Sequence, residues 1–254
     1  MNIFYNILAA LLCFLFGYIF GSIPTSIWIG KLFFHQDPRD YGSHNAGGTN
    51  AGRLWGKKVG LLIIILDMIK TIAPTWIAWA FLTFAKVNNG MALCPSVLNV
   101  NNFGFNTAYL IPWHVYWLTA FGCCIGHCFP MFANFKGGKG VSCFMGITIA
   151  STWMLGFIPG LTYLLILKLK KYVSLASILV AILDAVVAWI WAILVMCKVI
   201  PQNLYWLPMY GINLAAGWLY ATVITLMAAI LIWRHRANIV RIKNGEESKI
   251  KWMK

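Results

Sequence analysis

Acidic residues are scarce in this chain: Asp and Glu number 6 among 254 residues, and all charged residues together make up only 10%. Soluble domains carry about a quarter charged residues, so this composition excludes an ordinary soluble globular protein. Paired cysteine spacings are also lacking, because the seven cysteines are scattered along the chain. A disulfide framework or a metal site is therefore not expected, and the cysteines are predicted to be small buried hydrophobes.

What the sequence has instead is apolar length. Hydrophobic residues make up 61% of the chain, which is more than a soluble core can bury and indicates a polytopic helical membrane protein. We expect one integral-membrane domain, residues 1–254. The formal net charge of +14, from 20 Lys and Arg, reports orientation and contact with anionic lipid and suits anionic substrates, whereas it does not indicate nucleic-acid binding.

The predicted fold class is all-α, with about seven transmembrane helices, the N-terminus outside and the C-terminus inside. Five spans are expected at 4–30, 59–85, 108–134, 173–197 and 212–233. Residues 141–167 pose a problem, because a single crossing would place the lysines at 168–171 outside, against the positive-inside rule. We therefore expect a hairpin of two short helices there, turning near Leu155–Gly160.

A Gly-rich stretch, Arg39–Arg53, interrupts the apolar sequence between the first two spans, and we call it the first loop. Glycine allows positive φ and a close approach of ligand to main-chain N–H groups, and successive N–H groups form an anion-binding concavity. Arginine at each end offers a fork of donors that fits phosphate. The plainer alternative is a solvated interhelical turn.

Three further features are expected at the same side of the membrane as the first loop. The segment Phe135–Gly140, called the second turn, is also basic and Gly-rich and is expected beside the first loop. Asp67 and Lys70, at i and i+3 in the second span, are either a structural ion pair or a support for the site. The basic tail, Arg234–Lys249, could be only a lipid-contacting anchor, but that reading leaves its Asn238 and Glu247 unexplained.

Three motifs in order resemble the bacterial acyl-phosphate glycerol-3-phosphate acyltransferase family, PlsY. They are Gly42–Asn50 with Arg53, Gly126–Pro130 with the second turn, and Arg236–Arg241 with Gly245–Lys249. The resemblance also covers Gly21–Pro24, the Asp67/Lys70 pair and Tyr172–Ser177, and so spans nearly the whole chain. His44 stands where the family usually has Gly, and Ile242 stands where it usually has Leu.

The resemblance implies acyl transfer from a fatty acyl phosphate to the 1-hydroxyl of glycerol 3-phosphate, without metal or cofactor. It implies that glycerol 3-phosphate is held by Arg53, Lys139, Ser174 or Ser177, His235 and Asn238. It implies that the acyl phosphate is held by Ser43, Asn45, Thr49 and Asn50, with main-chain groups of Gly42, Gly47 and Gly48. The substrate-binding set is completed by Lys136, Gly137 and Gly138. The catalytic candidates are Ser43, Asn45, Arg53, Lys139, His235 and Asn238. The residues expected to be structural are Asp67, Lys70 and Glu247.

The same resemblance implies a multi-pass protein of the bacterial cell membrane whose site faces the cytoplasm. Its partners would be membrane lipid and the enzyme that produces acyl phosphate in the same pathway. Two rival readings remain. His35–Asp40 has the H-x4-D spacing of acyl-CoA-dependent glycerolipid acyltransferases, in which His is the general base. A transporter of phosphorylated metabolites is the alternative outside enzymes.

Overall fold

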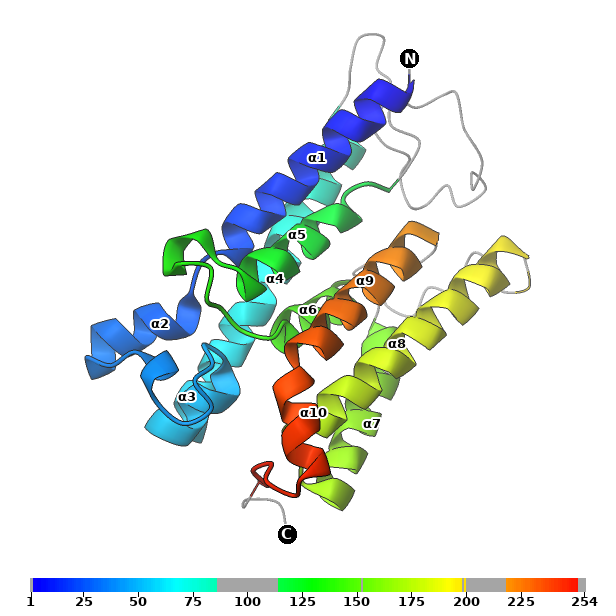
Figure 1. Ribbon diagram of the computed structural model, residues 1–254. Coiled ribbons are helices and arrows are strands. Elements are labelled where there is room, and N and C mark those ends of the chain that lie inside the picture. The colour runs from blue at the N-terminus through cyan, green and yellow to red at the C-terminus, as the bar shows by residue number, and fades with distance from the viewer. Residues whose placement is uncertain (1, 86–113, 152, 198, 200–217, 251–254) are drawn as a thin grey trace. The chain divides into compact units, whose positions relative to one another are not determined.

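The computed structural model describes residues 2–85, 114–151, 153–197, 199 and 218–250 (Figure 1). Every regular element in these residues is a helix, as the composition predicts. The chain divides into two compact units, Met1–Ala150 and Ser151–Lys254, and each is described by itself. The single integral-membrane domain stays a prediction.

Three apolar helices form the frame of the first unit. They are α1 (Asn2–Gly21), α4 (Lys57–Phe84) and α5 (Trp117–Cys128), and α1 packs against both of the others. Large apolar side chains also point outward, such as Leu12, which is 57% exposed. Such a surface is costly in water but suits hydrocarbon, where a helix satisfies all of its backbone groups internally.

The α1–α5 contact joins backbone to backbone. Each helix carries a G-x-x-x-G pattern, which lets apolar helices approach closely: Gly17 and Gly21 on α1, Gly122 and Gly126 on α5. A Cβ on Gly17 would overlap the carbonyl of Thr119, and a Cβ on Gly21 would overlap that of Cys123. Because the matched positions advance together, α1 and α5 run parallel, and the segments that follow them begin at the same end of the unit.

The segment after α1 is built from short helices. Pro24 follows the end of α1 and separates it from the next helix. The elements are α2 (Thr25–Ile29), a π-helical turn (Gly30–Phe34), a 3₁₀ turn (Pro38–Asp40) and α3 (Gly48–Trp55). The helix α3 packs against α4, and the rings of Phe34 and Trp55 stack with centroids 4.7 Å apart. This places the first loop against the start of α4.

The segment after α5 lies against the segment after α1. A 3₁₀ turn (Met131–Ala133) leads through the second turn to α6 (Val141–Ser151). Ala133 packs with Ile27 and Ala46 in a small buried cluster. The predicted proximity of the first loop and the second turn is therefore confirmed within the first unit.

The second unit contains four helices. They are α7 (Trp153–Lys170), α8 (Val173–Met196), α9 (Trp218–Arg234) and α10 (Arg236–Lys243). The expected pair of helices in 141–167 is present as α6 and α7, but the predicted turn at Leu155–Gly160 is wrong, because these residues lie inside α7. Pro159 removes one N–H donor, and the remaining backbone bonds keep an apolar segment helical.

Three helical segments of the described residues are long and apolar enough to cross a membrane: Ile3–Phe34, Lys57–Leu82 and Val173–Leu194. A fourth is added if α9 and α10, bent by 54°, are counted as one span. The predicted spans at 108–134 and 212–233 lie partly outside the described residues. The count of seven spans and the N-out, C-in orientation stay predictions.

Candidate functional site

Asn50 organises the first loop from within. Its side chain is 1% exposed, and its Nδ2 group lies within hydrogen-bond distance of the Pro38, Tyr41 and Asn45 carbonyls at 2.7, 3.0 and 3.1 Å. Its Oδ1 accepts a bond of 3.0 Å from the Ser43 N–H. One buried amide thus holds together a loop that makes few other internal bonds. The predicted contact of Asn50 with an acyl phosphate stays a prediction, while the contacts seen here are with its own loop and with Pro38 directly before it.

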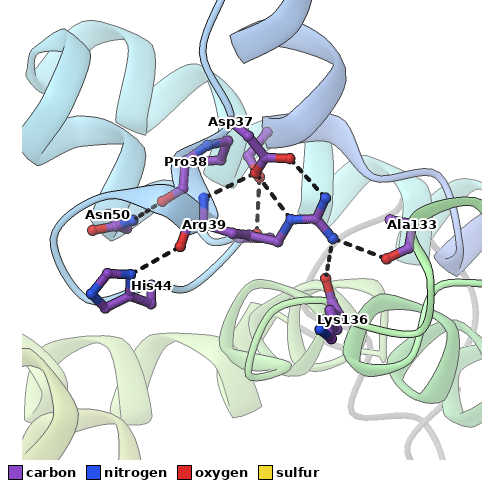
Figure 2. Close-up of polar contacts among 9 residues, drawn as sticks. Asp37, Pro38, Arg39, His44, Asn50, Ala133 and Lys136 are labelled. Atoms are coloured by element: carbon purple, nitrogen blue, oxygen red, sulfur yellow. Dashed lines mark hydrogen bonds and ion pairs between the residues drawn. The ribbon is translucent and has the colours of Figure 1, made fainter.

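Two residues of the first loop have left-handed backbone conformations, Gly42 with φ 61° and His44 with φ 53°. Histidine is among the residues that adopt this region more readily than most. The ring Nδ1 of His44 lies 3.0 Å from the Arg39 carbonyl oxygen, which can only accept, so Nδ1–H is the donor (Figure 2). The loop therefore keeps a backbone shape that favours Gly although His stands at position 44.

The main-chain N–H groups of residues 45–49 have no protein acceptor among the described residues. They lead into the first turn of α3, where helical N–H groups lack partners for geometric reasons. Thr49 and Arg53, four residues apart, lie on one exposed face of α3. Arg53 makes no hydrogen bond or ion pair within the described part of the chain, and Ser43 and Asn45 are half-buried. This arrangement offers donors and one positive charge to an anion.

Gly47 and Gly48 differ in what surrounds them. Gly47 precedes α3 in an extended conformation that any residue can adopt, and a Cβ there would meet only Asn45 Nδ2, at 3.1 Å. A Cβ on Gly48 would lie 2.7 Å from the Gly60 carbonyl oxygen and 2.6 Å from Ile64 Cγ1, both on α4. Gly48 is therefore required for the close packing of α3 on α4.

The backbone of the second turn is fastened to the end of α5. The N–H of Gly137 donates to the Cys128 carbonyl at 3.2 Å, and that of Gly138 donates to the His127 carbonyl at 3.0 Å. A Cβ on Gly138 would overlap the His127 ring. These bonds use carbonyls that the helix end leaves unpaired, and they fix the backbone next to the partly exposed Lys139.

Arg39 joins the first loop to the second turn. Its Nη1 donates to the Ala133 carbonyl at 2.9 Å and, more weakly, to the Lys136 carbonyl at 3.3 Å (Figure 2). Its Nε and Nη2 donate to the two carboxylate oxygens of Asp37 at 3.0 and 2.7 Å. The first loop and the segment that follows α5 thus meet at one guanidinium group.

A buried charged cluster lies beneath the two loops. Asp67 Oδ1 is 2.7 Å from Lys70 Nζ and 3.7 Å from His127 Nδ1, and it accepts a bond of 3.0 Å from Thr25 Oγ1. Lys70 also donates to the Ile23 carbonyl at 2.9 Å. The i, i+3 pairing expected for Asp67 and Lys70 is present. The same carboxylate also gathers groups from α2 and α5, which the sequence reasoning missed.

In the second unit, Glu247 ties the tail to α8 and α10. Its Oε1 accepts bonds from Ser174 Oγ at 2.8 Å and Asn238 Nδ2 at 2.7 Å. Its Oε2 accepts from Arg241 Nε at 2.8 Å. The Glu247 side chain is 7% exposed. These contacts give Asn238 a partner inside the protein, which a purely lipid-contacting tail would not do.

Two other predicted site residues, Ser177 and His235, also make hydrogen bonds within the second unit. Ser177 Oγ donates to the Val173 carbonyl at 2.9 Å, and His235 Nδ1 donates to the Leu231 carbonyl at 2.8 Å. Both side chains are buried. Because Nδ1 of His235 carries a proton, Nε2 accepts a hydrogen bond in the neutral ring and donates one only in the imidazolium form.

The electrostatics of Glu247 give a testable dependence on pH. Burial alone would raise the pKa of Glu247, but bonds from Asn238, Arg241 and Ser174 outweigh it, so the pKa lies below its usual value. A depressed pKa adds stability that is fully present above the unfolded value, about 4.3, and is lost as pH falls through the folded value. We expect Glu247→Gln to lower Tm at pH 7, with the gap to wild type closing in acid. Thermal unfolding in detergent from pH 7 to pH 3 would measure it, and a gap independent of pH would contradict it.

No group of three or more His, Cys, Asp or Glu side chains placed to hold a metal ion occurs among the described residues. The described cysteines are free thiols; five are buried and Cys197 is exposed. The expectation that the protein needs no metal or cofactor stays a prediction.

Sequence reasoning missed Arg39, Asp37 and His127 as partners of the motif residues. A signal for Asp37 and Arg39 exists, because Asp-Pro before a short helix is typical of a capped turn, and Asp37 does accept from the Arg39 N–H at 3.0 Å. For His127 the signal was its place inside the second motif. Its contact with Asp67, far away in the sequence, is not visible from spacing.

The family model described as "Glycerol-3-phosphate acyltransferase" matches residues 11–245. The glycerol-3-phosphate acyltransferase of Listeria monocytogenes serotype 4a (strain HCC23) is 35% identical over 240 residues, covering 94% of this chain and 96% of that protein. The one from Mycoplasmopsis synoviae (strain 53) is 30% identical over 259 residues, covering 100% of each.

The fold is also similar to that of solved structures with the same description. The crystal structure of PlsY (YgiH), an integral membrane glycerol 3-phosphate acyltransferase, in its glycerol 3-phosphate form superposes with a TM-score of 0.69 at 28% identity and covers 95% of this chain and 96% of that one. Its lysophosphatidic acid form gives a TM-score of 0.66 at 27% identity, covering 95% of each chain.

Proposed function

The chain belongs to the glycerol-3-phosphate acyltransferase family, as its three motifs predict, and we propose that it transfers a fatty acyl group from acyl phosphate to the sn-1 hydroxyl of glycerol 3-phosphate. The products are lysophosphatidate and inorganic phosphate, and the reaction is the first step of phospholipid synthesis. The observation that carries the proposal is the row of N–H groups at residues 45–49, which lack protein acceptors among the described residues and are flanked by Arg53. Such a row suits an anionic phosphate and a developing oxyanion.

The reaction needs little from the protein beyond alignment and charge. Phosphate is a good leaving group, so no enzyme nucleophile is required. The hydroxyl oxygen attacks the acyl carbon, the bond from carbon to the phosphate oxygen breaks, and a phosphate oxygen takes the hydroxyl proton. Donors already in place for two anions and for the oxyanion lower the barrier, together with orientation of the hydroxyl.

For the acyl phosphate we propose the N–H row with Ser43, Asn45 and Thr49, while Asn50 shapes the loop from inside. For glycerol 3-phosphate we propose Arg53 of the first motif and Lys139 of the second. Lys136 is exposed and is proposed to add positive charge beside them. Gly137 and Gly138 allow the turn to lie directly on His127.

For the third motif we also propose contacts with glycerol 3-phosphate. Ser174 and Ser177 both donate their hydroxyl protons inside the protein, so either can only accept from a substrate hydroxyl in this arrangement. We favour Ser174, because it shares Glu247 with Asn238. His235 would contact the substrate phosphate as imidazolium.

Assay of the purified protein tests the proposed function. Acyl phosphate and glycerol 3-phosphate together should yield lysophosphatidate and phosphate in equal amounts, whereas omission of glycerol 3-phosphate should abolish phosphate release. Acyl transfer to glycerol 3-phosphate from acyl-CoA in the absence of acyl phosphate would favour the H-x4-D reading. In the described residues no hydrogen bond joins His35 to Asp40. Uptake of glycerol 3-phosphate into vesicles without acyl transfer would favour the transporter.

We also propose a multi-pass protein of the bacterial cell membrane, with its N-terminus outside and the first loop, the second turn and the tail in the cytoplasm. Its partners are then membrane lipid and the enzyme that makes acyl phosphate. We expect a cysteine placed at Lys249 to react with a membrane-impermeant thiol reagent only after the cells are opened. Cys197 should be replaced in the same background because it is exposed. Labelling of position 249 from outside intact cells would overturn the orientation.

A further inference from the structure

Each of the three guanidinium nitrogens of Arg39 donates to a protein acceptor. Two nitrogens donate to Asp37, and the third donates to the carbonyls of Ala133 and Lys136 (Figure 2). The side chain is only 22% exposed. The idea that arginines at both ends of the first loop bind phosphate is therefore not favoured for Arg39 in this arrangement, since each of its nitrogens already donates to the protein.

Asp37 has the features of a residue that orients this arginine. It receives two nitrogens of the guanidinium in a bidentate pair, which fixes the plane of the group as well as its charge. Bonds from Arg39 hold the pKa of the Asp37 carboxyl below its usual value, with a smaller contribution from Lys31. The pair is therefore ionised at neutral pH. Arg39 is left with one nitrogen directed at the segment that follows α5.

We infer that Arg39 is a positioning residue, which sets the first loop against the second turn and thereby aligns the two substrates for acyl transfer. The inference rests on the proposed function, in which the first loop holds acyl phosphate and glycerol 3-phosphate is held by Lys139 of the second turn together with Arg53. The carbonyl of Lys136 lies three residues before Lys139, and Gly137 and Gly138 connect them in a turn bonded to α5. A shift of the first loop relative to this turn changes the distance between donor and acceptor, and reaction rate is sensitive to small errors of alignment.

Three substitutions separate position from charge. Arg39→Lys keeps the charge but loses the planar fork that reaches Asp37 and the Ala133 carbonyl together. Asp37→Asn keeps Arg39 but removes the carboxylate that orients it. Lys31→Ala, the matched control, removes a nearby exposed cation that has no placed role in binding.

The experiment measures kcat, both KM values and amide hydrogen exchange of residues 131–140 in each folded variant. We expect Arg39→Lys to lower kcat about three- to tenfold, with both KM values changed less than twofold, and to speed exchange in 131–140. Asp37→Asn should show the same changes at smaller amplitude, and Lys31→Ala should resemble wild type. Each variant must first elute as a single detergent-solubilised species.

Unchanged kcat or unchanged exchange in Arg39→Lys would overturn the inference. A normal Arg39→Lys enzyme together with a raised KM for acyl phosphate in Arg39→Ala would identify a phosphate ligand and would also overturn it. If Arg39→Ala does not fold, the Lys and Asp37→Asn variants decide. If the wild type makes no lysophosphatidate, the proposed function fails, while the exchange measurement still decides whether Arg39 links the two segments.

Discussion

Replacement of Lys139 by Ala is expected to raise the KM for glycerol 3-phosphate by about tenfold to a hundredfold. Lys139 lies directly after Gly138, whose N–H is bonded to the His127 carbonyl, so the backbone that carries the cation is held in place. Loss of a charge-assisted contact typically removes about 1.5–3 kcal/mol, which corresponds to that range in affinity. Initial rates at varied glycerol 3-phosphate, with acyl phosphate saturating, measure the change.

Two further variants sharpen the Lys139 prediction. Lys139→Arg restores the charge but has a larger head beside tightly packed glycines, so only part of the affinity should return. Lys58→Ala removes an exposed cation at the start of α4 and should leave the KM within about twofold, since exposed charges contribute little. An unchanged KM in Lys139→Ala would reject its role as a ligand of glycerol 3-phosphate.

Patterns in the sequence predict the parts of this molecule that depend on local chemistry. Apolar runs locate the helices, and the i, i+3 spacing of Asp67 and Lys70 anticipates their ion pair. The excess of basic residues in two Gly-rich segments places both on one side, and the bonds from Arg39 to the second turn confirm that they lie together. The helices and the ion pair are predicted correctly because periodicity and i, i+3 spacing act over short stretches, while the membrane side of the two segments stays a prediction.

Contacts between distant residues could not be predicted in the same way. Ser174 and Glu247 are 73 residues apart, yet they share a hydrogen bond because the tail folds back on α8. The helix through Pro159 also defeated the expectation of a turn, since proline and glycine end helices in water more readily than in apolar surroundings. In the first case long-range packing determined the structure, and in the second case the apolar environment did. Residue spacing contains information on neither.

Glycine shows the same limit, because its identity does not say why it is needed. A glycine can serve a positive φ, a ligand that approaches the backbone, or a neighbouring helix that packs closely. Gly42 falls in the first class, with φ 61°. Gly48 falls in the third, whereas the sequence placed it in the second with Gly47. These two adjacent glycines differ in role only because α4 packs against Gly48 and not against Gly47.

That separation gives a prediction for the two glycines. Gly48→Ala is expected to cost about 1–3 kcal/mol of stability, because its Cβ would press on the Gly60 carbonyl, which is backbone and cannot move away. Turnover should fall more than in Lys57→Ala, because the start of α3 moves together with its N–H groups. Thermal unfolding and kcat, measured on the same preparations, report the two effects.

Gly47→Ala is the sharper probe of the phosphate site. Its backbone is already extended, so the change should cost less than about 1 kcal/mol, mostly through the poorer cap that Ala provides. If acyl phosphate lies against the N–H row, the new methyl group occupies its place, and turnover should fall about tenfold at every ionic strength. A charge effect such as that of Lys57→Ala should instead fade as salt shortens the Debye length from about 10 Å at 0.1 M toward 3 Å at 1 M. Full activity of a stable Gly47→Ala enzyme across a salt series would show that the loop is only a connector, because the side-chain amide of Asn45, at 3.1 Å, is the only protein group near that Cβ in the described part of the chain.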